Sequence, residues 1–358
     1  TNWWQKVHTD MHQIVVNPYN NNQLWNLNDG GAWLSTDGGN NWSPKSDGIN
    51  GYEIYHGNCS PTRKDMISIG TQDNGELYST SAGWFCNRGG DWGAQCAFDY
   101  RPNSSMVYYY GGNKRRLVTS GESTYGLSST FTLDDIAFHR SNPDLAFAAD
   151  SVIMRTTNLT ATTPTWTQIA SLGYIIKAIH VSVADANRLY IITNNGQIHV
   201  STNAQAATPT FTTYALPNTT GNKASITTVP NDPNVIYITA NTKVYKSTNN
   251  GATWTQITYN LPSVNHIRIL ADEYSTNELV FVASNNTVYY KVGNATSWTL
   301  INTNLPSRTE AIDLSIFNDG TSNSSLRYAS YGRSMWETPI TNLKTLNAQF
   351  SASNTNPC

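Results

Sequence analysis

Charged residues are scarce in this chain. Asp, Glu, Lys and Arg make up 13% of its 358 residues, which is about half of the usual share. The formal net charge is -2, so the excess of Lys and Arg that holds nucleic acid or an anionic membrane is missing. No apolar run approaches the length of a membrane span. The composition therefore argues against nucleic-acid partners and membrane insertion.

Cysteine is also rare, and the four cysteines form no C-x-x-C pair, so a structural zinc site is not expected. Asn, Ser and Thr supply the polarity instead, which suits strands, tight turns and an extracellular protein. In that setting we expect a disulfide among Cys59, Cys86 and Cys96, and we predict the pair Cys86–Cys96. The partner of Cys358, the last residue, is expected in a following domain.

A repeat runs along the chain. Eight short β-like segments follow one another at steps of 40, 43, 38, 43, 48, 41 and 43 residues. Each leads through a turn, often Asn-Pro or Asp-Pro, to an apolar run, a second turn and two further strand-like stretches. Four strands in about 40–45 residues are typical of one propeller blade. No stretch shows a helical period. The sequence predicts an all-β propeller of four-stranded blades over residues 1–341.

The last segment supplies only three strands, and an open ring would leave a long unpaired strand edge. The first residues, "NWWQKV", are similar to the fourth strands "TWTQIA" and "TWTQITY". We therefore predict that Trp3–Val7 complete the last blade and close the ring. This arrangement gives eight blades. Seven is the alternative, if the irregular second and third segments merge.

Two octamers, "STDGGNNW" and "STNNGATW", fall between the third and fourth strands of a blade. Their Asp or Asn can accept backbone N–H bonds within a turn, and their Gly can take a positive φ. The closing Trp can pack between blades. We predict a structural role for their key residues: Ser35, Asp37, Gly39, Trp42, Ser247, Asn249, Gly251 and Trp254.

These octamers resemble the Asp-box, or BNR repeat, of sialidase-like and sortilin-like propellers. The phrases "NDGGAWLSTDGG", "GTQDNGELY" and "SYGRSMWET" resemble secreted Asp-box proteins common in Bacteroidetes, and the tail "NAQFSASNTNPC" resembles the opening strand of a PKD domain. The resemblance implies an extracellular or cell-surface location. It also implies that residues 342–358 are a linker and the start of a following Ig-like domain, in a larger multidomain protein.

Unusual residues gather on one face of the predicted ring. Loops that enter an inner strand and loops that join second and third strands share this face, called the top, where function usually lies. The top loops of blades five to seven carry no charged residue, whereas charged residues cluster in those of the last blade and of blades one to four. We predict a ligand-binding set there: Asp29, Gln72, Asp73, Asn74, Asp91, Trp92, Tyr331 and Arg333.

A metal site is a second hypothesis for this face. His8, Asp10 and His12 alternate by two, so an extended segment would point them the same way, toward Asp29. Imidazole and carboxylate suit a transition metal, and the oxygen-rich "NDGG" and "QDNG" loops would suit calcium. The alternative is that all of these are hydrogen-bonded turn residues. No cofactor is certain from the sequence.

Three functions remain open. The first is recognition of a glycan or an extracellular protein on the top face. The second is glycoside hydrolysis, which needs two carboxyl groups across the scissile bond, with Asp73 and Asp91 as the candidates. The arginine triad and "RIP" motif of sialidases are absent. The third is a rigid spacer. We favour recognition, because fold-level analogy is poor support for hydrolysis.

Overall fold

The computed structural model describes residues 7–49, 51–88, 96–109, 114–117, 121–127, 131, 136–218, 224–274, 277–285, 287–301, 305 and 310–340. Within these ranges the chain is all-β and holds no helix, so none is long and apolar enough to cross a membrane. The strands pair in eight antiparallel sheets, seven of four strands and one of three. The predicted fold class and four-stranded unit are confirmed.

The strands of the first sheet are β1 (Met11–Asn17), β2 (Asn20–Asn28), β3 (Gly31–Ser35) and β4 (Ser43–Pro44). The next three sheets are β5 (Ile54–Cys59), β6 (Ile67–Thr71), β7 (Gly75–Thr80), β8 (Gly83–Arg88); β9 (Cys96–Phe98), β10 (Met106–Tyr109), β11 (Lys114–Leu117), β12 (Gly121–Thr124); and β13 (Ile136–Phe138), β14 (Ala146–Ala149), β15 (Val152–Thr156), β16 (Thr167–Ser171). The remaining sheets are β17 (Ile176–Val181), β18 (Leu189–Thr193), β19 (Gln197–Ser201), β20 (Thr212–Ala215); β21 (Ala224–Val229), β22 (Asp232–Ala240), β23 (Lys243–Ser247), β24 (Thr255–Gln256); β25 (His266–Ala271), β26 (Leu279–Ser284), β27 (Val288–Val292), β28 (Thr299–Leu300); and β29 (Ala311–Phe317), β30 (Ser325–Ser330), β31 (Ser334–Pro339).

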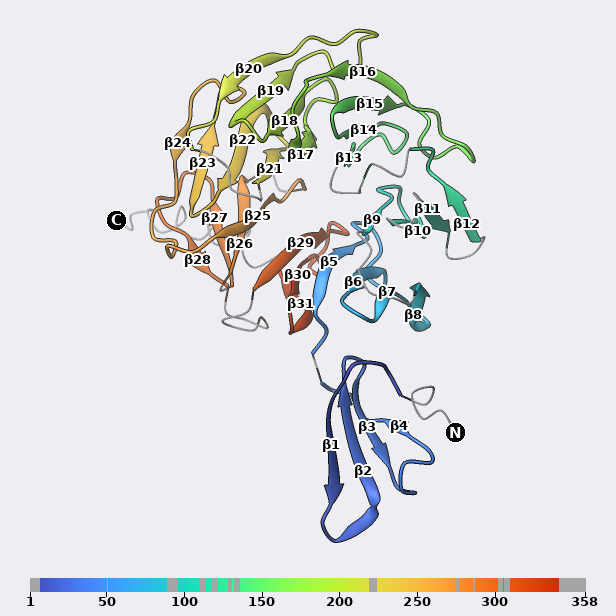
Figure 1. Ribbon diagram of the computed structural model, residues 1–358. Coiled ribbons are helices and arrows are strands. Elements are labelled where there is room, and N and C mark those ends of the chain that lie inside the picture. Colours follow the sequence, from blue (N-terminus) through green and yellow to red (C-terminus); the bar gives the residue numbers. More distant parts are fainter. Residues whose placement is uncertain are drawn as a thin grey trace, which may run out of the picture.

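Seven of these sheets, from β5–β8 to β29–β31, follow one another around a ring with their first strands innermost (Figure 1). A buried apolar cluster fills each of the seven boundaries between neighbouring sheets. Second strands such as β18 and β26 are buried along their whole length, because neighbouring sheets cover both of their faces. Burial of apolar area between sheets is therefore the main stabilising term of the ring.

The ring closes where β29 and β30 contact β5. Ile54 and Ile69 pack on Ala329 at this boundary. Gly57 lies where β5 passes β30, and a Cβ at this position would be 2.6 Å from the Cβ of Ala329, so only glycine fits without displacement of the backbone. The N–H of Gly57 donates to Oδ2 of Asp313 on β29 at 3.1 Å.

The first sheet lies outside this ring and is connected to it by the segment that leads into β5 (Figure 1). None of the apolar clusters formed by the described residues includes a residue of this sheet. The prediction of an eight-bladed ring therefore differs from the structure. The second and third segments also do not merge, because they form the separate sheets β5–β8 and β9–β12.

Closure of the ring also differs from the prediction. The described part of the last sheet has three strands, and its inner strand lies beside β5 rather than beside the first sheet. Residues 1–6, which hold most of the predicted closing strand, lie outside the described residues. His8, which follows that segment, lies on the β2–β3 turn. Residues 342–358, the predicted start of a following domain, are also outside the described residues.

Candidate functional site at the junction of the first sheet and the ring

Three carboxyl groups from separate segments meet where the first sheet touches the ring. Asp10 precedes β1, Asp29 lies in the β2–β3 turn, and Asp73 lies in the β6–β7 turn. One carboxylate oxygen from each lies within 4.8 Å of the others. We call Asp10, Asp29 and Asp73, together with His8 and His12, the junction cluster. The sequence predicts the loops of these three on the top face of a single ring, whereas the structure brings them together between the first sheet and the ring.

Local backbone geometry positions these groups. Asp10 and Asp73 take positive φ angles of 54° and 61°, a conformation that Asp tolerates better than most residues. Asn74 donates from Nδ2 to the carbonyl oxygen of Asp29 at 3.0 Å, which ties the ring to the first sheet. The His8 side chain covers Gly30, where a Cβ would be 2.4 Å from the Cβ of His8, and its Nε2 lies 3.1 Å from the carbonyl oxygen of Asp73.

His12 pairs with Asp29 through its Nε2 atom. The hydrogen bonds from His12 and then from Asp73 hold the pKa of Asp29 below its usual value. Three carboxylates this close repel one another unless a proton or a cation is shared. Oxygen donors of this kind suit Ca²⁺ or another hard divalent cation. Of the residues predicted for a His-containing metal site, His8 is turned to the backbone carbonyl of Asp73. Asp73 belongs to the "QDNG" loop of the calcium hypothesis.

A second group of polar side chains adjoins the junction cluster through the β6–β7 turn. Oε1 of Gln72 lies 2.8 Å from the Tyr55 hydroxyl and 3.0 Å from the Tyr331 hydroxyl. The Tyr331 hydroxyl also donates to Oε2 of Glu53 at 2.8 Å, a bond that raises the pKa of Tyr331 to about 12. The two rings lie 6.0 Å apart and tilted. We call Glu53, Tyr55, Gln72 and Tyr331 the tyrosine group.

Among the described residues, Arg333 is the predicted ligand residue that does not join these groups. Arg333 is exposed in the β30–β31 turn, where its carbonyl oxygen accepts a hydrogen bond from the Trp336 indole at 2.6 Å. Asp91 and Trp92 lie outside the described residues. The pair of carboxylates proposed for hydrolysis, Asp73 and Asp91, is therefore represented only by Asp73, which belongs to the junction cluster.

The two octamers form matching turns, one between β3 and β4 and one between β23 and β24. In the first, the Gly39 N–H donates to Ser35 Oγ at 2.9 Å and the Asn41 N–H donates to Asp37 Oδ1 at 2.8 Å. In the second, the equivalent bonds run from Gly251 to Ser247 at 2.8 Å and from Thr253 to Asn249 at 2.9 Å. Trp42 and Trp254 are both partly buried. Every polar atom named here serves the turn itself.

The predicted Cys86–Cys96 disulfide is absent, since all three described cysteines are free. Cys86 is exposed on β8, the outermost strand of its sheet, and Cys96 is buried on β9, the innermost strand of the next sheet. Three strand spacings of about 4.8 Å separate an inner from an outer strand, far beyond the roughly 7 Å limit between bridged Cα atoms. Cys96 instead points its thiol at the carbonyl oxygen of Ser68, 3.1 Å away.

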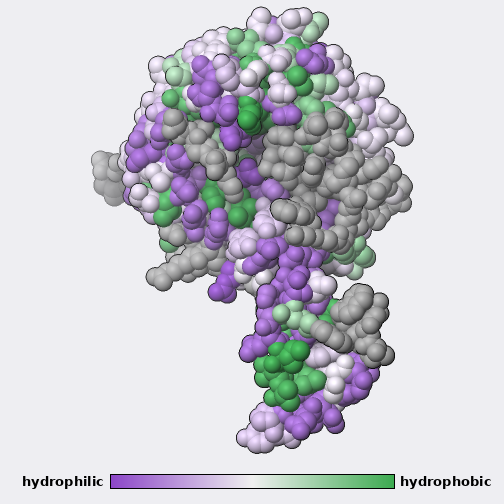
Figure 2. Space-filling view, viewed as in Figure 1, coloured by the Kyte–Doolittle hydropathy of each residue, from purple (hydrophilic) through white to green (hydrophobic). Residues whose placement is uncertain are grey.

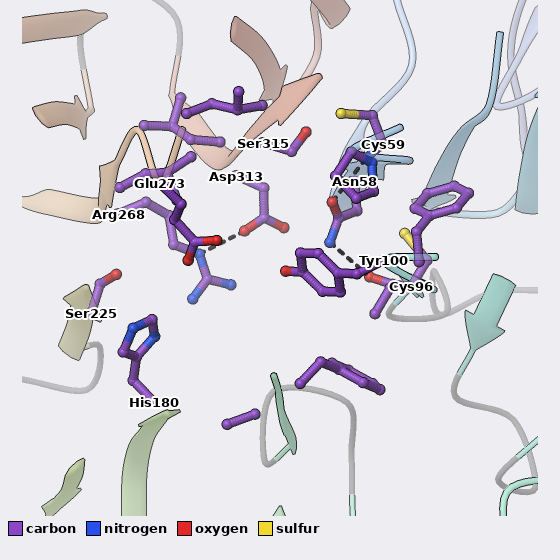
Figure 3. Close-up of a pocket in the computed structure, with 18 of the residues that line it drawn as sticks. Asn58, Cys59, Cys96, Tyr100, His180, Ser225, Arg268, Glu273, Asp313 and Ser315 are labelled. Atoms are coloured by element: carbon purple, nitrogen blue, oxygen red, sulfur yellow. Dashed lines mark hydrogen bonds and ion pairs between the residues drawn. The ribbon is translucent and has the colours of Figure 1, made fainter. Parts of the chain in front are cut away.

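A polar cavity of about 300 Å³ in the middle of the ring did not emerge from the sequence (Figure 3). Asp313 on β29 accepts a hydrogen bond from Arg268 Nε at 2.6 Å, and its other oxygen lies 3.8 Å from His56 Nδ1. His180 on β17 also faces the cavity, and burial lowers its pKa to about 4, so its ring is neutral at pH 7. The available signal was a charged residue or a histidine within some of the apolar inner strands, such as β5, β17, β25 and β29.

Glu273, just after β25, directs its carboxyl group into the same cavity (Figure 3). Burial raises its pKa from an ordinary 4.5 to about 7, and the positive charge of Arg140 only partly opposes this change. The guanidinium of Arg140 lies 3.4 Å from the centre of the Tyr274 ring, which holds it in place. The cavity therefore contains a carboxyl group whose pKa lies near neutral pH, so that it can hold or release a proton there.

Glu273 makes stability depend on pH in a direction that can be tested. The unfolded chain loses this proton near pH 4.5 and the folded chain near pH 7, so stability falls as pH rises through this window and levels off above it. At pH 8 the free energy of unfolding of Glu273→Gln should be on the order of 1–2 kcal/mol higher than that of wild type. At pH 4 the two free energies should differ little. Urea unfolding at both pH values measures this, with exposed Glu310→Gln as the control. Parallel pH profiles for wild type and Glu273→Gln would contradict the assignment.

Comparison with known proteins agrees with the fold. The family model of the DUF6242 β-propeller domain matches residues 160–338, half of the chain. No curated protein matches the sequence.

Two solved structures are similar to the chain. The GH74 xyloglucanase from Xanthomonas campestris has a TM-score of 0.63 and 14% identity, over 90% of this chain and 49% of that chain. An ancestral GH74 enzyme has a TM-score of 0.50 and 16% identity, over 95% of this chain and 46% of that chain. The chain thus spans about half the length of either structure. At this identity the likeness shows the fold alone.

Proposed function

The chain belongs to the family of the DUF6242 β-propeller domain, and we propose that this propeller recognises a carbohydrate through the junction cluster and the adjoining tyrosine group. The observation that carries the proposal is the convergence of polar side chains from segments 8–12, 28–31, 72–74 and 331 on one face. Repeated blades need turn residues, but they do not need three carboxylates from two separate sheets within 4.8 Å of one another. An extracellular location is part of this proposal.

The chemistry of the surface fits a sugar. Carboxylate, amide and phenol groups can donate to and accept from neighbouring hydroxyl groups. The ring faces of Tyr55 and Tyr331 carry the negative side of an aromatic quadrupole, which attracts C–H groups such as those on one face of a pyranose. The Tyr331 hydroxyl donates its proton to Glu53, so its oxygen is left to accept a hydrogen bond from a sugar hydroxyl. A divalent cation on Asp10, Asp29 and Asp73 would relieve their repulsion and could bind vicinal hydroxyls.

The test is a glycan array that includes xyloglucan, read with calcium and with chelator. The double variant Asp29→Asn/Asp73→Asn should lose at least about tenfold in affinity for any glycan that wild type binds, equivalent to 1.4 kcal/mol. Asp319→Asn, an exposed aspartate in the turn after β29, is the matched control and should bind as wild type does. Unchanged affinity in the double variant would remove the junction cluster from the site, and an array without any signal would favour the spacer.

Glycoside hydrolysis in the central cavity of the ring is a second candidate function. Two carboxyl groups in different surroundings line this cavity, Glu273 with a raised pKa and Asp313 bonded to Arg268. A carboxyl group with a pKa of about 7 can act as a general acid, and a second carboxylate can stabilise positive charge. Both oxygens of Asp313 are engaged, by Arg268 and by the Gly57 N–H, so this residue is better suited to charge stabilisation than to attack. Release of reducing sugar by wild type but not by Glu273→Gln would promote this candidate over simple binding.

A further inference from the structure

The first sheet is a four-stranded blade, and among the described residues no other sheet shares an apolar cluster with it. Its four strands pair in the order β1-β2-β3-β4, like the four-stranded sheets of the ring. Its second strand nevertheless shows a largely exposed burial pattern, whereas β18 and β26, the second strands of two ring sheets, are fully buried. Ile14 is 55% exposed and Val15 is 43% exposed. The sequence therefore supplies apolar side chains that the described structure leaves in contact with solvent.

Both faces of this sheet are apolar. Directly paired residues of antiparallel strands share a face, and neighbours along a strand alternate. Val15 pairs with Trp25, which pairs with Leu34, so these three lie on one face. Val16 pairs with Leu24 and, with Ile14, lies on the other face, to which Trp33 also belongs through its pairing with Asn26. Figure 2 shows such an apolar patch over the first sheet, away from the ring.

Patches of this kind on a soluble domain mark an interaction surface. The ring cannot take the first sheet as an eighth blade, because seven apolar clusters already close it. Another copy of the chain would offer the same closed ring, and two first sheets packed together would cover only one face of each. The occupant must instead supply two blade-like faces, one on each side.

We propose that the first sheet is a blade of a second β-propeller, formed by a part of the same polypeptide outside residues 1–358. The blades on either side of it in that ring would cover its two apolar faces. The solved GH74 structures are consistent with this arrangement. Each of these structures is a single chain about twice as long as the present one. The match covers at least 90% of the present chain, which is more than the ring residues 54–358 alone would give. The matched region therefore includes part of the first sheet.

The experiment compares residues 1–358 alone with the natural-length polypeptide. Single substitutions Ile14→Cys and Val15→Cys place a thiol on each face, and Tyr19→Cys places one at the β1–β2 hairpin tip, where Tyr19 is 96% exposed. Maleimide labelling is followed for each peptide by mass spectrometry, so native thiols do not interfere. In residues 1–358 all three cysteines should react at similar rates. In the natural-length polypeptide the thiols at 14 and 15 should react at least about tenfold more slowly, with position 19 unchanged.

Other outcomes overturn the proposal. Equal labelling of positions 14 and 15 in both proteins would mean that no blade covers the sheet. Protection of only one face would mean a single partner rather than membership of a ring. Protection in residues 1–358 that rises with protein concentration, together with a dimer mass by light scattering, would assign the surface to a second copy of this chain.

Discussion

Trp298→Ala should lower the free energy of unfolding by about 3–5 kcal/mol, the range measured when a buried aromatic residue is truncated. Trp298 is only 3% exposed and packs in the cluster between the sheets β21–β24 and β25–β28. Its indole N–H donates to the carbonyl oxygen of Ile257 at 2.7 Å, so truncation also leaves a buried acceptor without a partner. Urea unfolding followed by circular dichroism measures the change.

The matched control is Trp84→Ala, because Trp84 lies on an outermost strand and is 54% exposed. We expect this variant to lose less than about 1 kcal/mol. If the two variants were equally stable, the cluster that contains Trp298 would not hold its two sheets together. A loss at Trp298 without a change in the cooperativity of unfolding would indicate that the ring unfolds as one unit.

Removal of Glu337 should be more damaging than removal of its partner Arg327. Arg327 on β30 is 2% exposed, and its Nε donates to Oε2 of Glu337 at 2.9 Å while Nη2 donates to the carbonyl oxygen of Lys64 at 2.5 Å. The bond to Lys64 joins the last sheet to the β5–β8 sheet, whereas the Arg327–Glu337 pair lies within the last sheet. Glu337→Ala leaves a buried guanidinium without its counter-charge, and we expect a loss of about 3 kcal/mol.

Arg327→Met replaces the buried charge by an apolar side chain of similar length. Glu337 is then left at a more exposed position, where it still lies 3.2 Å from Lys64 Nζ. We expect this variant, and also Arg327→Met/Glu337→Gln, to be more stable than Glu337→Ala. The reverse order in urea unfolding would mean that the hydrogen bond from Arg327 to the Lys64 carbonyl stabilises the protein more than the Arg327–Glu337 ion pair does.

Acid should weaken the same boundary. Burial raises the pKa of Glu337, but the charges and hydrogen bonds of Arg327 and Lys64 together outweigh it and hold the pKa below the ordinary value of 4.5. The contribution of Glu337 is therefore fully present above that value and is lost as pH falls through the lower, folded pKa. This dependence is opposite in sign to that of Glu273, so the two carboxyl groups can be told apart in one pH series.

Sequence alone predicted the fold class and the four-stranded unit. Alternation of apolar residues and the turn residues between them are local properties, and they specify four-stranded antiparallel sheets without knowledge of their neighbours. Counting strands within each repeat then puts Asp10, Asp29 and Asp73 at the same end of their sheets, and the structure brings their carboxylates within 4.8 Å of one another.

The channel residues could not be found in this way. Arg268 and Asp313 are separated by one full repeat, and His56 is far from both in the sequence. They meet only because their strands become the inner wall of a closed ring. The predicted Cys86–Cys96 disulfide was wrong for the same reason. The two cysteines are close in sequence, but they lie on opposite edges of neighbouring sheets.

Local sequence thus determined that the chain makes eight similar β-sheets and which residues lie at their turns, because hydrogen-bonded pairing and side-chain alternation are set over a few residues. Tertiary structure decided which sheets share a ring. A blade has the same apolar pattern inside a ring and outside it, so membership depends on which faces pack together. The close contact of Gly57 with Ala329 and the hydrogen bond from Arg327 to the Lys64 carbonyl bring the last sheet onto β5, and this packing leaves the first sheet outside.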